Sequence, residues 1–159
     1  MEKANSNLIF ILKYTKHVWK KLNQPTLALS VLRDEYEKNP ESEHLCLALQ
    51  KLLRAESQFL EAEELLKRGI AGKFENSQRV WLQAVQLQRQ LNNHQQALVL
   101  VNQALEKFST NFKLWLMKAQ ILQIFGPTDA VREAYECALQ VSELRSEAKL
   151  WIAASDFEI

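Results

Sequence analysis

The sequence predicts an all-α protein, built as a right-handed α-solenoid of helical hairpins with about four and a half repeats. Two observations lead to this prediction. Helix breakers are rare, since only three Gly and three Pro occur among 159 residues, and the remaining composition favours helix. Segments of similar pattern also recur about every 34 residues, without the alternation that is typical of strands.

The recurrence is clearest in three segments that share a Trp position: VWLQAVQL (80–87), LWLMKAQI (114–121) and LWIAASDF (150–157). Leu12 and Cys46 take this position in two earlier segments, so the successive spacings are 34, 35, 34 and 36 residues. A small residue follows the position by 16 residues in each full unit. These small residues are Ala28, Ala62, Ala97 and Val131.

Each full unit is expected to contain two helices joined by a turn. Residues typical of turns occur at NQPT (23–26), KNPES (38–42), LNNHQQ (91–96), KFSTNFK (107–113) and FGPTD (125–129). In KFSTNFK, Ser109 and Thr110 are predicted to cap the helix that follows. We expect one repeat domain over 1–159. Its units are about 6–40, 41–75, 76–109 and 110–145, with a half unit at 146–159.

A hairpin of this kind has an apolar face that it buries by stacking on its neighbours. The large residue on the first helix fills space inside the hairpin, and the small residue on the second helix allows a close approach. Trp81, Trp115 and Trp151 are therefore predicted to be packing residues rather than a platform for stacked bases. Because the half unit presents Trp151 and Ile152 without a second helix, we expect a fragment of a longer array.

Several classes of function find no support in the sequence. The net charge of +1 gives no global field toward nucleic acid or an anionic membrane. There is no phosphate-binding loop, nucleophile motif or metal motif, and the three His are isolated, so no enzyme, cofactor or metal is predicted. The apolar run LIFIL is too short to span a membrane. Cys46 and Cys137 are expected to be buried free thiols.

The positions of the large and small residues resemble the tetratricopeptide (TPR) repeat. Details resemble its relative in RNA processing, the half-a-TPR (HAT) repeat. The pair of Phe157 and Glu158, six residues after Trp151, matches the first helix of that motif, and VREAYECAL (131–139) matches the second. Other units lack the Glu, so the residues leave HAT and plain TPR both open.

Three segments carry a more specific resemblance: FKLWLMKAQI (112–121), REAYECAL (132–139) and LWIAASDFE (150–158). Together these are similar to consecutive HAT repeats of the spliceosomal pre-mRNA-processing factor six family, and the likeness covers roughly residues 45 to 159. Members of that family are long HAT arrays that bridge proteins of the tri-snRNP. The resemblance implies a nuclear scaffold with snRNP proteins as partners.

The first helices also carry a stripe of basic and amide residues. In this repeat class the first helices form the inner wall, and the positions two before, five after and eight after the large residue share one helix face. Asp156 in the half unit is the exception to an otherwise acid-free set. The set comprises His44, Lys51, Arg54, Arg79, Gln86, Arg89, Lys113, Gln120, Gln123 and Lys149.

The stripe supports two interpretations. It is either a polar face that keeps the protein in solution, or a groove for an acidic partner segment whose carboxylates the Arg side chains hold. The leading functional hypothesis is a protein–protein scaffold in a splicing ribonucleoprotein. Direct RNA binding is the alternative, and a TPR adaptor outside splicing is another. No membrane partner is expected, and end-to-end or dimer association is a further expectation.

Overall fold

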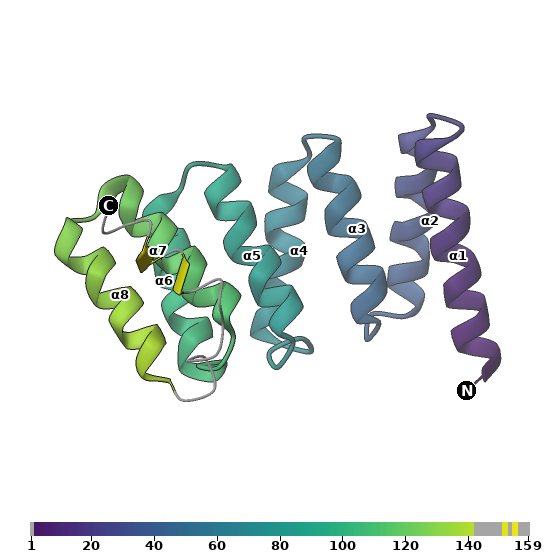
Figure 1. The fold of residues 1–159 in the computed structure, drawn as a ribbon. Coiled ribbons are helices and arrows are strands. Elements are labelled where there is room, and N and C mark those ends of the chain that lie inside the picture. The colour runs from purple at the N-terminus through teal and green to yellow at the C-terminus, as the bar shows by residue number, and fades with distance from the viewer. Residues whose placement is uncertain (1, 142–150, 153, 156–159) are drawn as a thin grey trace. The chain divides into compact units, whose positions relative to one another are not determined.

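The computed structural model describes residues 2–141, 151–152 and 154–155 (Figure 1). All its regular elements in these ranges are helices, as the sequence predicted. The first four are α1 (Glu2–Lys20), α2 (Pro25–Lys38), α3 (Glu43–Ala55) and α4 (Phe59–Ala71). The next four are α5 (Gln78–Gln90), α6 (His94–Lys107), α7 (Phe112–Phe125) and α8 (Thr128–Gln140).

The chain divides into two compact units, residues 1–75 and 76–159. In the first unit α1 packs against α2, α2 against α3, and α3 against α4. In the second unit α5, α6, α7 and α8 follow the same sequence of contacts. Each unit is therefore a pair of hairpins stacked in chain order (Figure 1). The expectation of one domain over 1–159 stays a prediction.

The small residues of the repeat are buried on the second helices. Ala28, Ala62 and Ala97 have no exposed surface, and Val131 is 1% exposed. A side chain no larger than Val at this point lets the backbone of the neighbouring helix come close. The burial of these four residues agrees with the predicted packing, and a close approach of the neighbouring backbone at them stays a prediction.

The large residues of the first helices are less uniform. Cys46 and Trp81 are buried, whereas Leu12 and Trp115 are half-buried. The Trp115 Nε1 group donates a hydrogen bond to the Ser109 carbonyl oxygen at 2.8 Å, so its polar edge reaches the surface turn. Trp151 is 51% exposed, and its prediction as a packing residue is wrong.

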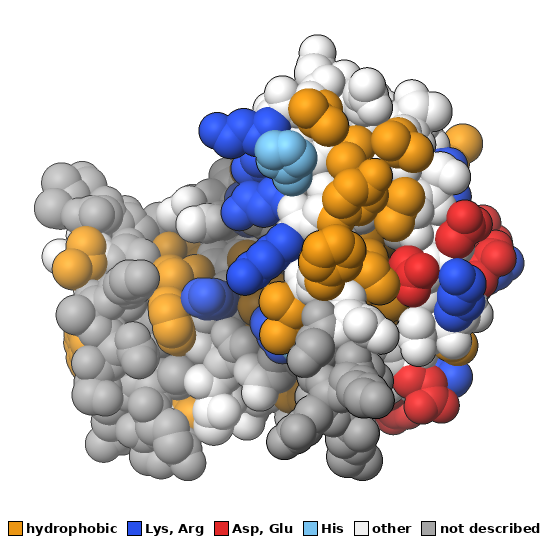
Figure 2. Space-filling model, turned by 90° about the vertical axis from the view of Figure 1, so that its right-hand side faces the viewer, with side chains coloured by type: hydrophobic (Ala, Val, Ile, Leu, Met, Phe, Trp, Pro, Cys, Tyr) orange, Lys and Arg blue, Asp and Glu red, His pale blue; other side chains and the backbone are white. Residues whose placement is uncertain are grey.

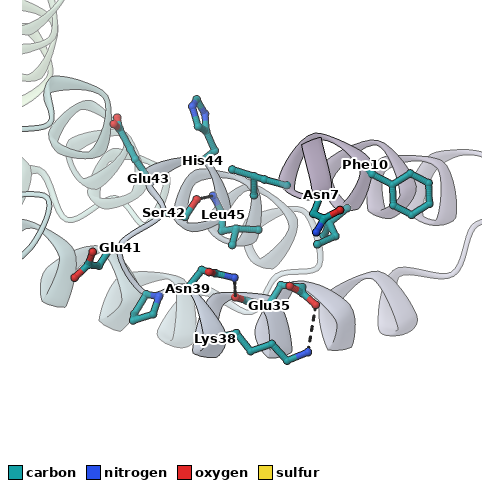
Figure 3. A pocket seen from close by; sticks show the side chains of 13 residues that line it. Asn7, Phe10, Glu35, Lys38, Asn39, Glu41, Ser42, Glu43, His44 and Leu45 are labelled. Carbon is teal, nitrogen blue, oxygen red and sulfur yellow. Dashed lines mark hydrogen bonds and ion pairs between the residues drawn. The ribbon is translucent and has the colours of Figure 1, made fainter. Parts of the chain in front are cut away.

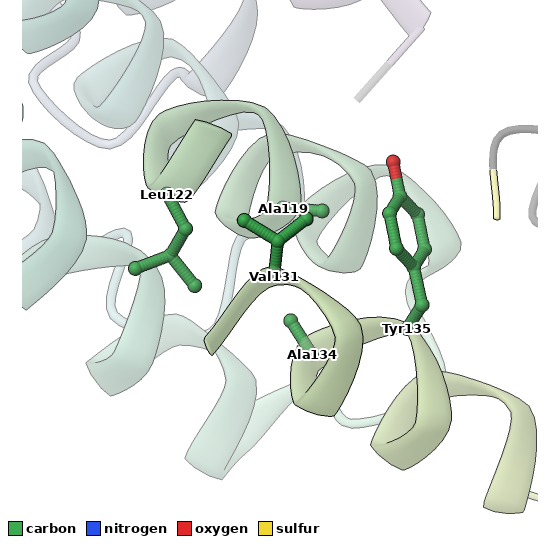
Figure 4. Close-up of a cluster of buried hydrophobic side chains, with 5 residues drawn as sticks. All are labelled: Ala119, Leu122, Val131, Ala134 and Tyr135. Atoms are coloured by element: carbon green, nitrogen blue, oxygen red, sulfur yellow. The ribbon is translucent and has the colours of Figure 1, made fainter. Parts of the chain in front are cut away.

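Figure 4 shows how a hairpin of the second unit buries its apolar face. Ala119 and Leu122 on α7 meet Val131, Ala134 and Tyr135 on α8. Ala154 is half-buried and packs against the same cluster. Most of the predicted half unit at 146–159 lies outside the described residues.

The turns inside the second and third hairpins share one geometry. Ser57 and Asn92 follow the ends of α3 and α5 in the left-handed backbone region, with φ of 62° and 61°. In each turn the next residue returns a hydrogen bond to the helix, from Gln58 N to Leu53 O at 2.8 Å and from Asn93 N to Gln88 O at 2.9 Å. This Schellman-type closure satisfies helix carbonyls that would otherwise lack a donor.

The other two hairpins depart from this geometry. In the first, Asn23 is also left-handed, with φ of 53°, but the returning bond runs from Gln24 N to Val18 O. In the fourth, Gly126 holds the equivalent place with φ of −95°, and Pro127 follows it. Because proline has no N–H, Pro127 cannot donate the returning hydrogen bond, and α8 begins directly at Thr128.

Side chains cap three of the first helices. The Ser42 hydroxyl accepts from Leu45 N and the Ser77 hydroxyl accepts from Val80 N, both at 3.3 Å. For α7 the cap is Asn111, which accepts from Lys113 N at 3.0 Å. The sequence interpretation had offered the Ser and Thr of 109–110 instead, and that prediction is wrong because the turn continues to Asn111 before the helix starts.

The left-handed turn gives a first testable prediction. Ser57→Gly is expected to raise the free energy of unfolding by about 0.5–1 kcal/mol, because glycine has no Cβ to clash in this region. The matched control is Ser30→Gly on the exposed side of α2, which should lower it by about 0.5–1 kcal/mol. Urea denaturation followed by circular dichroism measures both, and a loss of stability in Ser57→Gly equal to that of the control would contradict the assignment.

Candidate partner-binding site

In the first unit, the basic side chains of the second helices α2 and α4 differ from those of the first helices α1 and α3 in whether they form ion pairs. Every basic residue of α2 and α4 is in an ion pair with a carboxylate. Arg33 holds Glu61 through two hydrogen bonds of 2.6 and 2.8 Å, which raise the pKa of the guanidinium. The other pairs are Lys38–Glu35, Lys67–Glu63 and Arg68–Glu64.

The lysines on the first helices behave differently. Lys13, Lys16 and Lys20 on α1 and Lys51 on α3 form no ion pair with any carboxylate in the described part of the chain. All four are exposed. Because α1 has no acidic residue after Glu2, Lys13, Lys16 and Lys20 have no carboxylate nearby on their own helix. Among the described helices of the first unit, the lysines without an ion pair therefore lie on the first helices α1 and α3.

Three of these lysines surround an apolar slot between α1 and α3. Leu12 and Trp19 of α1, Ala48 and Leu52 of α3, and Leu32 of α2 line it, and its volume is about 210 Å³. Lys16, Lys20 and Lys51 line it as well, together with Thr15. The Lys20 Nζ lies 5.3 Å from the centre of the Trp19 ring, a distance suited to a cation–π contact. The lining contains no carboxylate.

The predicted stripe residues of the first unit do not all belong to this slot. Lys51 lines it, as described above. Arg54 is half-buried on α3, where its Nη1 lies 3.4 Å from Gln50 Oε1, and burial lowers the pKa of its guanidinium. His44 is exposed and lines a different groove.

That second groove is larger and carries both signs of charge (Figure 3). Its volume is about 930 Å³, and the start of α1, the end of α2 and the start of α3 form its walls. Glu35 and Lys38 form an ion pair at 3.5 Å along one wall, and Asn39 donates to the Glu35 carbonyl oxygen at 3.3 Å. Because its charges are mixed and partly paired, this groove does not select an acidic ligand.

The remaining stripe residues lie in the second unit. Arg79, Gln86, Lys113, Gln120 and Gln123 are exposed on α5 and α7. Arg89 is half-buried, and its Nη1 lies 3.4 Å from Gln86 Oε1. Lys149 lies outside the described residues. Whether these side chains continue the surface of Lys51 and Arg54 as one stripe stays a prediction.

Sequence reasoning missed the contribution of α1 to the slot. Lys20 follows Leu12 by eight residues, which is the same offset that placed Arg54 and Arg89 in the stripe. Lys16 and Trp19 follow Leu12 by four and seven residues, so they share the side of α1 that faces α3. Applying the stripe offsets to the first unit would have found Lys20, whereas Lys16 lies at an offset that the stripe did not include.

The two cysteines differ in their surroundings. Cys46 is a buried free thiol, as predicted, whereas Cys137 is exposed and its predicted burial is wrong. Burial raises the pKa of the Cys46 thiol to about 11, although its hydrogen bond with Tyr36 acts in the opposite direction. Burial likewise raises the pKa of Tyr36 to about 12. Cys46 is therefore a packing residue of the hairpin and not a nucleophile.

No group of His, Cys, Asp and Glu in the described part of the chain is placed to hold a metal ion. None of the described helices is long and apolar enough to cross a membrane.

The stacked hairpins define the class of fold as a TPR-like helical repeat, and solved structures agree. A crystal structure of MamA matches with a TM-score of 0.66 and 14% identity, covering 99% of this chain and 93% of that one. MamA from Desulfovibrio magneticus RS-1 gives 0.62 and 9% identity, covering 93% and 95%. YrrB, described as a TPR protein with an unusual peptide-binding site, gives 0.59 and 11% identity, covering 92% and 74%.

These likenesses confirm the predicted fold, an α-solenoid of helical hairpins. At such low identity they establish the fold alone. No protein-family profile and no curated protein sequence matches the chain.

Proposed function

We propose that the protein is a non-enzymatic interaction scaffold whose first unit binds an acidic segment of a partner protein. The observation that carries the proposal is the apolar slot between α1 and α3. Lys16, Lys20 and Lys51 line it, and within the described part of the chain they form no ion pair and the lining has no carboxylate. An apolar side chain of the partner would enter the slot, and flanking carboxylates would pair with the lysines. Unpaired lysines already in place favour a negatively charged ligand.

The slot gives a direct binding prediction. A fluorescent peptide with one leucine between acidic residues is expected to bind the chain, and an analogue with Gln and Asn in place of the acids should bind at least about tenfold more weakly. Lys16→Glu combined with Lys51→Glu should weaken binding of the acidic peptide by a similar factor. Fluorescence anisotropy measures both, and raising the salt concentration should weaken the wild-type complex.

The control is Lys67→Glu, which changes an exposed lysine on α4 that does not line the slot. It should bind the acidic peptide like the wild type. Two results would contradict the proposal that the slot binds an acidic segment. One is equal binding of the acidic peptide by the wild type and by Lys16→Glu with Lys51→Glu, and the other is equal binding of the acidic and amide peptides.

The finer proposal is a scaffold in a pre-mRNA splicing assembly, the tri-snRNP, in the nucleus. Its support is the sequence resemblance of 112–121, 132–139 and 150–158 to the pre-mRNA-processing factor six family. The likeness to MamA and YrrB fits a TPR adaptor outside splicing equally well. The unpaired lysines would also suit phosphate groups, and for this reason direct RNA binding remains the alternative.

Capture from nuclear extract separates these three functions. We expect the immobilised chain to retain identifiable snRNP proteins after nuclease treatment and to lose them when Lys16→Glu and Lys51→Glu are introduced together. Retention that disappears with nuclease would assign the lysines to RNA. If the wild-type chain retains no snRNP protein under either condition, the splicing proposal fails and an adaptor outside splicing takes its place.

A further inference from the structure

A further groove of the first unit lies between α2 and α4, with α3 along its floor. Residues within 33–37, 49–53 and 61–68 line it, and we call it the α2–α4 groove. None of its lining residues also lines the slot or the groove of Figure 3. Its volume is about 350 Å³, near the lower end of the roughly 300–1,000 Å³ that small-molecule pockets occupy. A space of this size suits one or two side chains of a partner segment.

Apolar side chains form the floor and part of both walls of the α2–α4 groove. Leu49 and Leu53 are four residues apart, so they share the face of α3 that lies beneath the groove. Tyr36 on α2 and Leu65 on α4 are half-buried and line the walls. A hydrogen bond between Tyr36 and Cys46 ties the tyrosine to α3. The groove therefore offers an apolar surface that can bury a side chain of a partner.

The two arginines of the α2–α4 groove are already paired with carboxylates of α4. Arg33 donates two hydrogen bonds to Glu61, at 2.6 and 2.8 Å, and a third to the side chain of Gln58 at 3.0 Å. Arg68 pairs with Glu64 at 2.6 Å. An acidic ligand would have to displace these carboxylates before it could bind either guanidinium group. The groove therefore does not favour an acidic segment.

Glu37 is a carboxylate of the groove that forms no ion pair within the described ranges, and it is exposed. Asp34, three residues before it on α2, is likewise exposed and forms no ion pair there. Lys38 pairs with Glu35 at 3.5 Å and lines the groove of Figure 3 instead. Figure 2 shows most of the acidic side chains in view gathered on one side, whereas most of the basic side chains lie on the other. The unpaired charge on α2 beside the groove is therefore negative.

We propose that the α2–α4 groove is a second docking surface and that its occupant is a partner segment with an apolar side chain beside a lysine or arginine. The apolar side chain would contact Leu49 and Leu65, and the cation would pair with Glu37. Charge complementarity selects this occupant, because the carboxylate is the charged group of the groove that is left to pair.

The α2–α4 groove and the slot have opposite charge preferences. The slot between α1 and α3 favours an acidic segment, whereas the α2–α4 groove favours a basic one. The first unit would therefore hold two different partner segments at the same time and bridge the proteins that carry them. The proposal for the α2–α4 groove does not depend on the slot, because the two sites share no lining residue.

Peptide binding tests the α2–α4 groove directly. A fluorescent peptide with one leucine between two arginines, in an otherwise uncharged sequence, is expected to bind the chain in a fluorescence anisotropy titration. Replacing its leucine by glutamine should weaken binding at least about tenfold, because the contact with the apolar floor is lost. Replacing both arginines by glutamine should have an effect of similar size. Glu37→Lys should also weaken binding of the basic peptide at least about tenfold, because like charges then face each other.

The matched control is Asp34→Lys, which makes the same change of charge on α2 at an exposed position that does not line the groove. It should weaken binding by less than about threefold, because salt screens a charge that the peptide does not touch. Circular dichroism checks that both variants keep their helices. Glu37→Lys should bind the acidic peptide like the wild type, so the groove and the slot fail separately.

Three results would overturn the proposal for the α2–α4 groove. The first is a wild-type chain that shows no saturable binding of the basic peptide. The second is an equal loss of binding in Glu37→Lys and Asp34→Lys, which would mean attraction to the acidic side of α2 as a whole. The third is equal binding of the leucine and glutamine peptides, which would mean that the apolar floor is not used.

Discussion

The structure depends on one constraint: the second helix of each hairpin keeps a small, buried residue that leaves room for a neighbouring helix. Ala28, Ala62 and Ala97 have no exposed surface, and Val131 has almost none. Close approach at this point brings the larger apolar side chains into contact, so that a cluster such as Ala119, Leu122, Val131, Ala134 and Tyr135 can form between two helices. Because each helix contacts the next in chain order, the same local solution serves every hairpin of a unit.

The distribution of charge follows from this architecture. In the first unit, Arg33 reaches from α2 to Glu61 on α4, and both residues are partly exposed, so their pairing adds little stability but neutralises that surface. Among the described residues, Lys16, Lys20 and Lys51 form no ion pair, and they lie around an apolar slot whose lining includes no carboxylate. The proposed interaction surface would therefore use side chains that the packing of the hairpins leaves exposed.

The repeat period predicted most of the fold because it reports packing directly. The spacing of Ala28, Ala62, Ala97 and Val131 located four buried positions, and Pro25 and Gly126 located two turns. The period also marks the turns inside the hairpins, since Asn23, Ser57, Asn92 and Gly126 are spaced by 34, 35 and 34 residues. Whether the residue at this position is left-handed depends on whether the next residue has an N–H to donate back to the helix. Exposure of Trp151 and Cys137 was not predictable in this way, because period identifies the position of a residue in a unit and not what covers it.

The candidate site was predicted only in part: Lys51 was found, whereas Lys16 and Trp19 needed the helix packing to reveal them.

The most direct test of the packing constraint is the free energy of unfolding of Ala62→Leu, compared with Ala71→Leu at an exposed position of the same helix. The account predicts a loss of about 1–3 kcal/mol for Ala62→Leu, because the added side chain must force α4 away from its neighbours. Ala71→Leu should change the free energy of unfolding by less than about 0.5 kcal/mol. Equal stability of the two variants would contradict the claim that close approach at the small residue holds the hairpins together.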